Sequence, residues 1–433
     1  MSPVAPVSLR PLLDRPVAVF GAGVSGEGVT ELVHGLGARV VVYDRKGGAA
    51  RAEFTATDAA GHGLVVFSPG FAPDHPWLAA ARAAGCTCLG ELDFAAQFWR
   101  GRIVAITGTN GKTTLTEFLT HALRTAGVPA LAVGNVGHSF SRAALGAHTP
   151  DTVAVCEVSS FQAETFRHFR AEAMLWTNLA EDHLERHLGM GAYFDAKLRL
   201  VHCTPSGRIW VGTSVAAWAG RLGRALPPET CLPTEGLRPD PRLVGTVFAE
   251  YPQRENFVLA AAWWRTAGLA EAALLAATRS FTLGRHRLTH VADVDGVGYW
   301  NDSKATNFHA VHGALQRFDR PVLLIAGGRA KGGDIQAFAT SLRGRVAHLL
   351  LIGETAAELA AGAASVGLPH TVCATLPEAV RRGAALASSG DHVLLSPAFA
   401  SFDMFRNYED RGDRFEAAVR ELADARRPAG VSA

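Results

Sequence analysis

Short apolar runs alternate with amphipathic stretches along most of the chain. In the first hundred residues, apolar runs at 17–20, 39–44 and 64–67 predict strands. Helical stretches are predicted from the glycines after the first run to about residue 37 and again at 77–84. Strands and helices in this order are typical of an open, parallel α/β sheet.

The middle of the chain continues the pattern around one strongly amphipathic helix. An apolar run at 102–106 predicts a strand. Beyond it, apolar residues recur at helical spacing i, i+3, i+4, i+7 and i+8, at Leu115, Phe118, Leu119, Ala122 and Leu123. Further strands are predicted at 152–156, 173–176 and 208–211, and the proline-rich stretch 226–241 is expected to be a surface loop.

From about residue 284, strands and alanine-rich helices alternate a third time. Strands are predicted at 321–325, 347–352, 370–373 and 391–395. A chain of 433 residues is long enough for about three domains. We therefore predict three α/β domains, at residues 1–96, 97–283 and 284–433, the last with a doubly wound sheet.

Composition and charge narrow the class of protein. The chain is 48% hydrophobic and 19% charged, which is typical of folded globular proteins rather than disordered ones. Lys and Arg number 42 against 40 Asp and Glu, so the formal net charge of +2 favours neither a nucleic-acid partner nor an anionic membrane surface. A phosphate ligand would have to be bound by a local site.

Cysteine spacing and the lengths of the apolar segments indicate the cellular compartment of the protein. The six cysteines are scattered, without the paired spacing of a zinc ribbon or a disulfide framework. The first twenty residues lack the long apolar core of a signal peptide. The apolar stretch 257–281 is interrupted by Arg265, Glu271 and Arg279, which favours buried helix over a membrane span. We predict a cytoplasmic protein.

The strongest chemical motif follows the strand at 102–106. It comprises seven consecutive residues: Gly108, Thr109, Asn110, Gly111, Lys112, Thr113 and Thr114. Small residues before a helix let backbone N–H groups surround a phosphate, with Lys112 on the β- and γ-phosphates and Thr113 on Mg²⁺. The match to the phosphate-loop pattern is imperfect because Ile106 stands at the first glycine position, and an ordinary strand-to-helix turn is the alternative.

A second glycine-rich turn lies near the N-terminus. Gly21, Gly23 and Gly26 follow a strand, and Asp44 ends the next one, as in the dinucleotide-binding fingerprint. The same geometry suits any nucleotide diphosphate, and a purely structural turn is the alternative. Small residues at 68–70 end a further strand at the same edge.

Carboxylate and imidazole side chains follow two strands of the middle segment. Glu157, Asp182 and His183 could converge beside the phosphate loop and bind a divalent metal, although each alone is more typical of a solvated loop. Lys197 lies in a helical stretch, and its residue type alone predicts a solvated position on the surface. In the last domain, polar clusters at 301–307, 327–331 and 396–402 follow strands, where open α/β sheets bind ligands.

Taken in order, these motifs resemble the Mur ligases of peptidoglycan synthesis over nearly the whole chain. The motifs that carry the resemblance lie at 108–114, 157–162, 178–183, 196–197, 286–287, 301–307 and 396–402. The resemblance implies a Rossmann-like N-terminal domain for a UDP moiety, a central P-loop ATPase domain with a mainly parallel sheet, and a C-terminal domain that brings an amino acid. Residues 68–70, 301–307 and 396–412 are similar to those of members that add D-glutamate to UDP-N-acetylmuramoyl-L-alanine.

The resemblance also implies the ATP and metal ligands. Lys112 would bind the transferred phosphate, Thr113 and Glu157 would hold one Mg²⁺, and His183 with a carbamylated Lys197 would hold a second. Carbamylation turns a cation that repels Mg²⁺ into a carboxylate that can bind it. Beyond the phosphate loop, the implied ATP contacts are Asn256, Arg287 and Asp302. Glu255 stands where these ligases often have histidine.

The two other substrates would be bound by residues from all three domains. The implied UDP-muramoyl contacts are Val24, Ser25, Asp44, Arg45, Ser68, Gly70, Asn135, Ser159 and Gln162. Either Arg45 or Lys46 could meet the uridine end. The implied D-glutamate contacts are Thr306, Lys331, Ser396 and Phe402.

The reaction implied is ATP-driven amide formation. The alanyl carboxylate would attack the γ-phosphoryl group to give an acyl phosphate, and the amine of D-glutamate would then displace phosphate. A sister ligase that adds another amino acid, or glutamate to a folate, is an alternative. A nicotinamide-dependent oxidoreductase that uses Gly21, Gly23 and Gly26 is another, but it leaves the phosphate loop without a role. We expect a monomer with no nucleic-acid or membrane partner.

Overall fold

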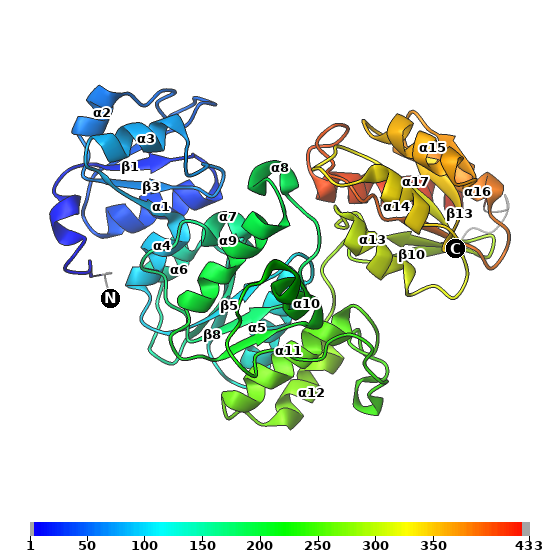
Figure 1. Ribbon diagram of the computed structural model, residues 1–433, viewed down its shortest axis with the longest axis horizontal. Helices are drawn as coiled ribbons and strands as arrows, with labels where there is room; N and C mark the ends of the chain where they lie inside the picture. Colours follow the sequence, from blue (N-terminus) through cyan, green and yellow to red (C-terminus); the bar gives the residue numbers. More distant parts are fainter. Residues whose placement is uncertain (1–3, 427–433) are drawn as a thin grey trace. The chain divides into compact units, whose positions relative to one another are not determined.

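The computed structural model describes residues 4–426 (Figure 1). The chain divides into two compact units. The first unit contains the chain up to Leu179, Gly191–Thr246 and Glu255–Phe281. The second contains Ala180–Met190, Val247–Arg254 and the chain from Thr282 onward. Two segments that the sequence places in the middle of the chain, 180–190 and 247–254, therefore group with the C-terminal part.

The first sheet lies at the start of the first unit and is wholly parallel. Its order is β2-β1-β3-β4, formed by β1 (Val17–Phe20), β2 (Val40–Tyr43), β3 (Leu64–Phe67) and β4 (Thr87–Gly90). Its helices are η1 (Arg10–Leu13), α1 (Val24–Gly35), α2 (Ala56–Ala60) and α3 (Pro76–Ala83). Alternate strand residues face α1 and α3 on opposite sides, as the period of two along a strand requires.

The second sheet, also parallel, has the order β6-β7-β5-β8-β9. Its strands are β5 (Arg102–Thr107), β6 (Ala130–Gly134), β7 (Val153–Glu157), β8 (Ala173–Trp176) and β9 (Ile209–Val211). The surrounding helices are α4 (Glu91–Ala95), η2 (Ala96–Phe98), α5 (Lys112–Thr125), α6 (Phe140–Leu145), α7 (Ser160–Ala163), α9 (Met190–His202), α10 (Thr213–Leu222), η3 (Pro241–Leu243), α11 (Gln253–Thr266) and α12 (Glu271–Ser280). The amphipathic helix expected after 102–106 is α5, and its five periodic apolar residues are all buried.

The third sheet, in the second unit, is mixed and has the order β10-β11-β15-β12-β13-β14. Its strands are β10 (Thr289–Val294), β11 (Val297–Asn301), β12 (Val322–Ala326), β13 (Val346–Leu351), β14 (His370–Val372) and β15 (His392–Leu395). Among the described strands of this sheet, only β10 runs antiparallel, to β11. The helices of this unit are α8 (Leu184–His187), α13 (Phe308–Leu315), α14 (Ile335–Ser341), α15 (Ala356–Ser365), α16 (Leu376–Leu386) and α17 (Tyr408–Arg426).

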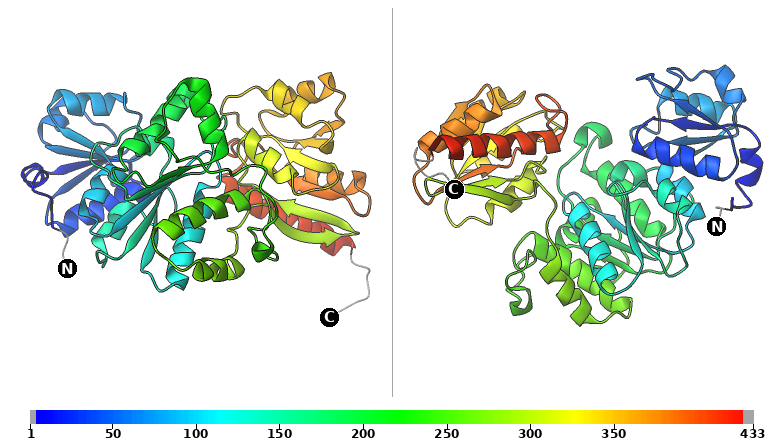
Figure 2. Two further views of the ribbon diagram at one scale, coloured as in Figure 1. Left: turned by 60° about the horizontal axis from the view of Figure 1, so that its bottom comes forward. Right: turned by 180° about the vertical axis from the view of Figure 1, so that it is seen from behind.

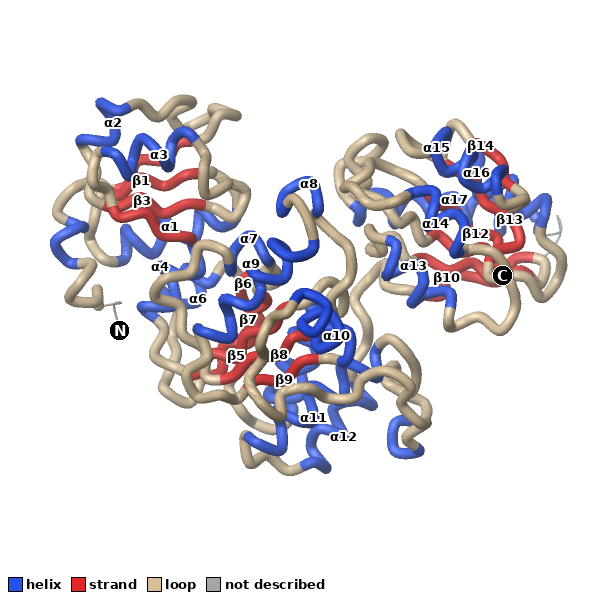
Figure 3. The backbone as a smooth tube through the Cα atoms, in the orientation of Figure 1, coloured by secondary structure: helices blue, strands red, loops and turns tan. Residues whose placement is uncertain are grey.

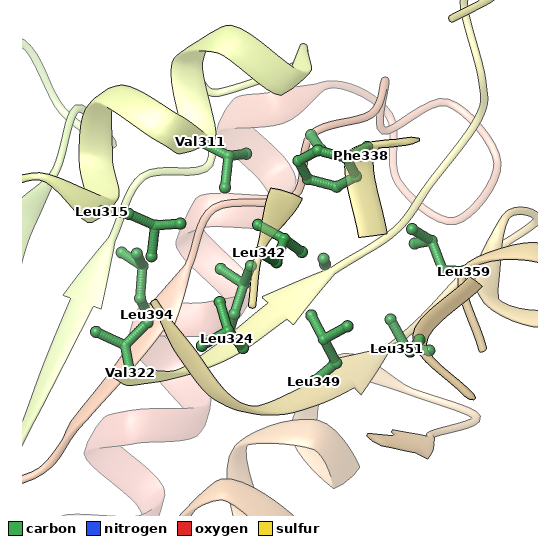
Figure 4. Close-up of a cluster of buried hydrophobic side chains, with 14 of the residues drawn as sticks. Val311, Leu315, Val322, Leu324, Phe338, Leu342, Leu349, Leu351, Leu359 and Leu394 are labelled. Atoms are coloured by element: carbon green, nitrogen blue, oxygen red, sulfur yellow. The ribbon is translucent and has the colours of Figure 1, made fainter. Parts of the chain in front are cut away.

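Helices cover both faces of this third sheet (Figure 3). Figure 4 shows one core, in which Leu324 and Leu394 from the strands meet Val311 of α13, Phe338 of α14 and Leu359 of α15. The neighbouring strand residues point the other way, toward α16 and α17, and Figure 2 shows α17 in red along that face. The predicted α/β class with mainly parallel sheets is confirmed.

No helix in the described range 4–426 is long and apolar enough to cross a membrane, and the apolar stretch 257–281 forms α11 and α12. All six cysteines are free thiols.

Candidate active site

The turn between β5 and α5 has the backbone of a phosphate-binding loop. Gly108 and Gly111 have φ angles of 146° and 81°, which strongly favour glycine. A Cβ atom on Gly108 would lie 1.9 Å from Thr177 Oγ1, and one on Gly111 would lie 2.8 Å from Asn256 Oδ1. The predicted ATP residue Asn256 is therefore at the loop, and both glycines are needed for close approach.

The chain after β8 holds this loop in place. Asn178 accepts a hydrogen bond from Asn110 N at 2.9 Å through Oδ1 and donates to Asn110 O at 3.2 Å. Thr177 Oγ1 donates to the same carbonyl at 2.6 Å. Asn178 belongs to a motif that the sequence singled out, but its role as a clamp depends on the neighbouring positions of β5 and β8, which spacing does not reveal.

Two lysines converge on the carbonyl of Gly108. Lys112 Nζ donates to Gly108 O at 3.0 Å and to Thr109 O at 2.9 Å. Lys197 Nζ, from α9, donates to Gly108 O at 2.9 Å and to Thr107 Oγ1 at 3.3 Å. The shared carbonyl brings both amines to the phosphate loop.

Lys197 is only 1% exposed, so the solvated reading of this lysine is wrong. The carbonyl, the hydroxyl and the face of the Tyr193 ring, whose centroid lies 4.8 Å from Nζ, together take the place of water around the amine. The helical pattern of α9 does not distinguish this position from a surface one.

Glu157 ends β7, next to β5 in the sheet, and is 2% exposed. Its Oε1 accepts a hydrogen bond from Asn135 Nδ2 at 2.9 Å, whereas its Oε2 is buried and has no hydrogen-bond partner among the described residues. A buried carboxylate oxygen without a donor is costly unless a ligand satisfies it. Thr113, the second residue of α5, is half-buried. The oxygen donors of Glu157 and Thr113 are of the kind that Mg²⁺ prefers, so these residues fit the ion.

His183 lies in the second unit, in a left-handed backbone conformation with φ 55°. Burial lowers the pKa of its imidazole, against the opposing effect of Asp182. Between residues 4 and 426, no group of three or more His, Cys, Asp or Glu side chains is arranged to hold a metal ion. The pairing of His183 with Lys197 at a second ion stays a prediction.

The predicted UDP contacts at the first sheet include a rigid turn. Asp44 accepts hydrogen bonds from Ala22 N at 2.8 Å and Lys46 N at 2.9 Å, and these bonds lower the pKa of its carboxyl. A Cβ on Gly21, which has φ 98°, would lie 2.7 Å from Ser68 Oγ. The structure thus brings the glycine-rich turn, Asp44 and Ser68 together at the carboxyl ends of β1, β2 and β3.

The other predicted UDP contacts have varied environments. Val24 is 62% exposed and Ser25 half-buried at the start of α1, and Gly70 is exposed. The Arg45 guanidinium lies 5.7 Å from the centroid of the Trp77 ring. Ser159 and Gln162 form the capping box of α7, with the Ser159 hydroxyl donating to Gln162 Oε1 at 2.9 Å. The choice between Arg45 and Lys46 at the uridine end stays open.

Two of the four predicted D-glutamate contacts meet in the second unit. Lys331 Nζ donates to Thr306 Oγ1 at 3.1 Å. Both line a recess that also includes Asp182, Asn307 and Phe399. Phe402 is 64% exposed and does not line this recess.

The fourth, Ser396, is fully buried and donates to Asp302 Oδ2 at 2.9 Å. Burial raises the pKa of the Asp302 carboxyl to about 7, although hydrogen bonds from Ser396 and Leu288 N act in the opposite direction. Arg287, half-buried, lies close enough to lower that pKa by its charge. The predicted ATP contacts Arg287 and Asp302 are therefore neighbours.

Arg411, which the sequence argument did not assign, connects two of the ligand loops. It is 1% exposed and donates to Ser303 O at 2.9 Å and to Phe399 O at 3.1 Å. Burial lowers the pKa of its guanidinium to about 10. The bonds tie the loop after β11 to the loop after β15, and a charged residue on the long helix α17 gives no sequence signal of such a role.

The comparisons with known proteins agree with this geometry. The family models Mur ligase middle domain and Mur ligase, glutamate ligase domain match residues 106–225 and 286–399. A UDP-N-acetylmuramoylalanine–D-glutamate ligase of Nitratidesulfovibrio vulgaris strain DP4 is 38% identical over 94% of this chain and 96% of its own. The chain belongs to the Mur ligase family. It is therefore an ATP-dependent enzyme that forms amide bonds.

Solved Mur ligases share the fold. The UDP-N-acetylmuramate–alanine ligase of Thermotoga maritima aligns with a TM-score of 0.58 at 16% identity, over 94% of this chain and all of the other. A MurF ligase from the same organism, solved with ADP, aligns with a TM-score of 0.56 at 15% identity, over 83% of this chain and 96% of the other. The family resemblance drawn from the motifs is confirmed, whereas the individual site residues stay predictions.

Proposed function

We propose that this Mur ligase joins D-glutamate to UDP-N-acetylmuramoyl-L-alanine in peptidoglycan precursor synthesis, with ATP converted to ADP and phosphate. The observation that carries the proposal is the phosphate loop with two lysines on one carbonyl and a buried carboxylate on the adjacent strand. The choice of substrates is supported by the D-glutamate ligase of Nitratidesulfovibrio vulgaris, which aligns over nearly its whole length, and by the loops at 68–70 and 301–307.

The first step supplies the leaving group that amide formation needs, because a free carboxylate could lose only oxide. The alanyl carboxylate attacks the γ-phosphorus of ATP, an O–P bond forms, and the bond to the ADP oxygen breaks. Lys112 would neutralise charge as it moves from the γ-phosphoryl group to ADP. The N–H groups at the start of α5 add the positive end of the helix dipole.

Divalent metal ions would be held by oxygen and nitrogen donors of this chain. Thr113 and Glu157 would bind one Mg²⁺, and His183 with carbamylated Lys197 a second. Bound Mg²⁺ would supply charge neutralisation on the phosphate oxygens. Carbamylation requires a neutral amine, and it would replace the charge of a lysine that is only 1% exposed by a carboxylate able to bind Mg²⁺.

The second step forms the amide. The amine of D-glutamate attacks the carbonyl carbon of the acyl phosphate, and the C–O bond to phosphate breaks as the C–N bond forms. Thr306 and Lys331 would orient the amino acid through a carboxylate. Asp44, Ser68 and the turn at Gly21 would hold the UDP end of the other substrate.

The test is an assay with UDP-N-acetylmuramoyl-L-alanine, ATP, Mg²⁺ and a labelled amino acid. We expect labelled product and matching phosphate release with D-glutamate, and far less with L-glutamate or L-alanine. Product with L-alanine but not D-glutamate would assign the chain to another branch of the family. Binding of a uridine nucleotide would distinguish this enzyme from a related ligase that acts on folates. Monomeric state and cytoplasmic location remain predictions.

A further inference from the structure

Asp182 faces the recess that contains Thr306 and Lys331, and the function proposed above gives this carboxylate no role. Its side chain is 9% exposed, and Oδ1 lies 3.5 Å from Lys331 Nζ, whose own side chain is 21% exposed. Opposite charges therefore lie side by side in the wall of one recess. All three residues belong to the second unit.

Both charges are attached to fixed parts of this unit. Asp182 Oδ2 accepts a hydrogen bond from Asn307 Nδ2 at 3.2 Å, while Asn307 Oδ1 caps α13 by accepting from Ala310 N at 2.9 Å. Lys331 is oriented by its bond to Thr306. The helix cap thus orients the carboxylate, and the ammonium keeps a fixed place beside it.

This arrangement matches the head group of a free amino acid. An α-amino acid carries an ammonium and a carboxylate on the same carbon, so it needs an anion and a cation at close range. We propose, on the basis of the function above, that Asp182 binds the ammonium of the incoming amino acid while Lys331 and Thr306 bind its α-carboxylate. Asp182 then selects amino acids over dicarboxylic acids of the same length.

The alternative role for Asp182 is to compete with the substrate for Lys331. The Asp182 carboxylate would imitate the substrate carboxylate on Lys331 and would have to be displaced. If Asp182 binds the ammonium, removing its charge should weaken the affinity for the amino acid. If Asp182 competes with the substrate carboxylate, removing its charge should strengthen that affinity.

The experiment compares D-glutamate with glutarate, which lacks only the amine, in the wild-type enzyme and in Asp182→Asn. We expect the KM for D-glutamate to rise at least tenfold in the variant, while the inhibition constant of glutarate stays the same or falls. Asp182→Glu should restore part of the D-glutamate affinity. An unchanged KM, or a parallel fall of KM and inhibition constant, would overturn the proposal.

Two controls distinguish a specific effect of Asp182→Asn from a general effect of charge removal and from misfolding. Glu354→Gln removes a carboxylate from an exposed ion pair with Arg329, 2.9 Å apart and outside the recess, and should leave both constants unchanged. The KM for ATP and the melting temperature report whether the Asp182→Asn variant is folded. If it is not folded, Asp182→Glu is used in its place to test the proposal. Absence of product from the wild-type enzyme would reject the proposed function itself.

Discussion

The side-chain amide of Asn135 donates a hydrogen bond to Glu157 Oε1 over 2.9 Å, while Glu157 Oε2 is buried and has no partner within residues 4–426. The bond fixes the carboxylate so that one oxygen remains for a metal ion. We predict that Asn135→Ala raises the dissociation constant of Mn²⁺ in the ADP complex roughly 10–100-fold, as is usual when a group that orients a metal ligand is lost. Electron paramagnetic resonance of free Mn²⁺ measures this constant.

The matched control is His138→Ala, an exposed residue of the same loop whose described hydrogen bonds are made by its backbone. Unchanged Mn²⁺ affinity in Asn135→Ala, together with a raised KM for the UDP substrate, would restrict Asn135 to substrate binding.

Lys112→Ala should lower turnover by roughly a hundredfold or more, because the removed cation balances charge that develops during phosphoryl transfer. ADP binding should weaken much less, since the backbone N–H groups of the loop remain. Steady-state kinetics and calorimetric titration with ADP measure the two effects. Thr125→Ala, at the exposed end of the same helix, serves as the control, and near-normal turnover of Lys112→Ala would contradict the assignment.

Lys197→Ala should also lose activity, and short-chain carboxylic acids should restore part of it by occupying the place of the carbamate. The wild-type enzyme in ¹³C-bicarbonate should show a carbamate resonance that Lys197→Ala lacks. Activity loss without rescue and without that resonance would leave Lys197 as an unmodified hydrogen-bond donor to Gly108.

Glu91 makes the stability of the first unit depend on pH. The side chain is 3% exposed, and burial raises the pKa of its carboxyl to about 7, against the hydrogen bond that it accepts from Ser141 N. The folded protein therefore retains a proton that the unfolded chain loses above its ordinary pKa of 4.5. Stability falls as pH rises between these values, by about 3 kcal/mol in total, and changes no further above pH 7 for this group.

Glu91→Gln removes this proton but keeps an acceptor for Ser141 N. As pH rises from 5 to 8, the melting temperature of the wild type should therefore fall relative to that of the variant. Scanning calorimetry at several pH values measures it, and a difference that is constant across this range would contradict the assignment.

Much of the fold can be predicted from periodicity because the parallel strands are buried apolar runs. The strand β6 was not predicted, since Ala130–Gly134 contains alanine and glycine rather than a β-branched run. The hairpin of β10 and β11 was also missed, although Asp295 and Gly296, with φ angles of 50° and 77°, are a recognised turn signal between alternating residues.

The site is predictable where one segment contains it and not where several segments meet. The phosphate loop is local, so its residues could be named from the sequence. The burial of Lys197 and the pairing of Asp182 with Lys331 depend on segments far apart in the chain, and residue type favours an exposed position for each.

The central claim is that a triphosphate bound at Lys112 phosphorylates the acceptor carboxylate. The most direct test uses UDP-N-acetylmuramoyl-L-alanine with both carboxylate oxygens labelled by ¹⁸O, together with ATP and D-glutamate. Attack by that carboxylate places one of its oxygens between carbon and phosphorus, so we predict that each released phosphate contains one ¹⁸O. Amide product accompanied by phosphate without ¹⁸O would contradict the account.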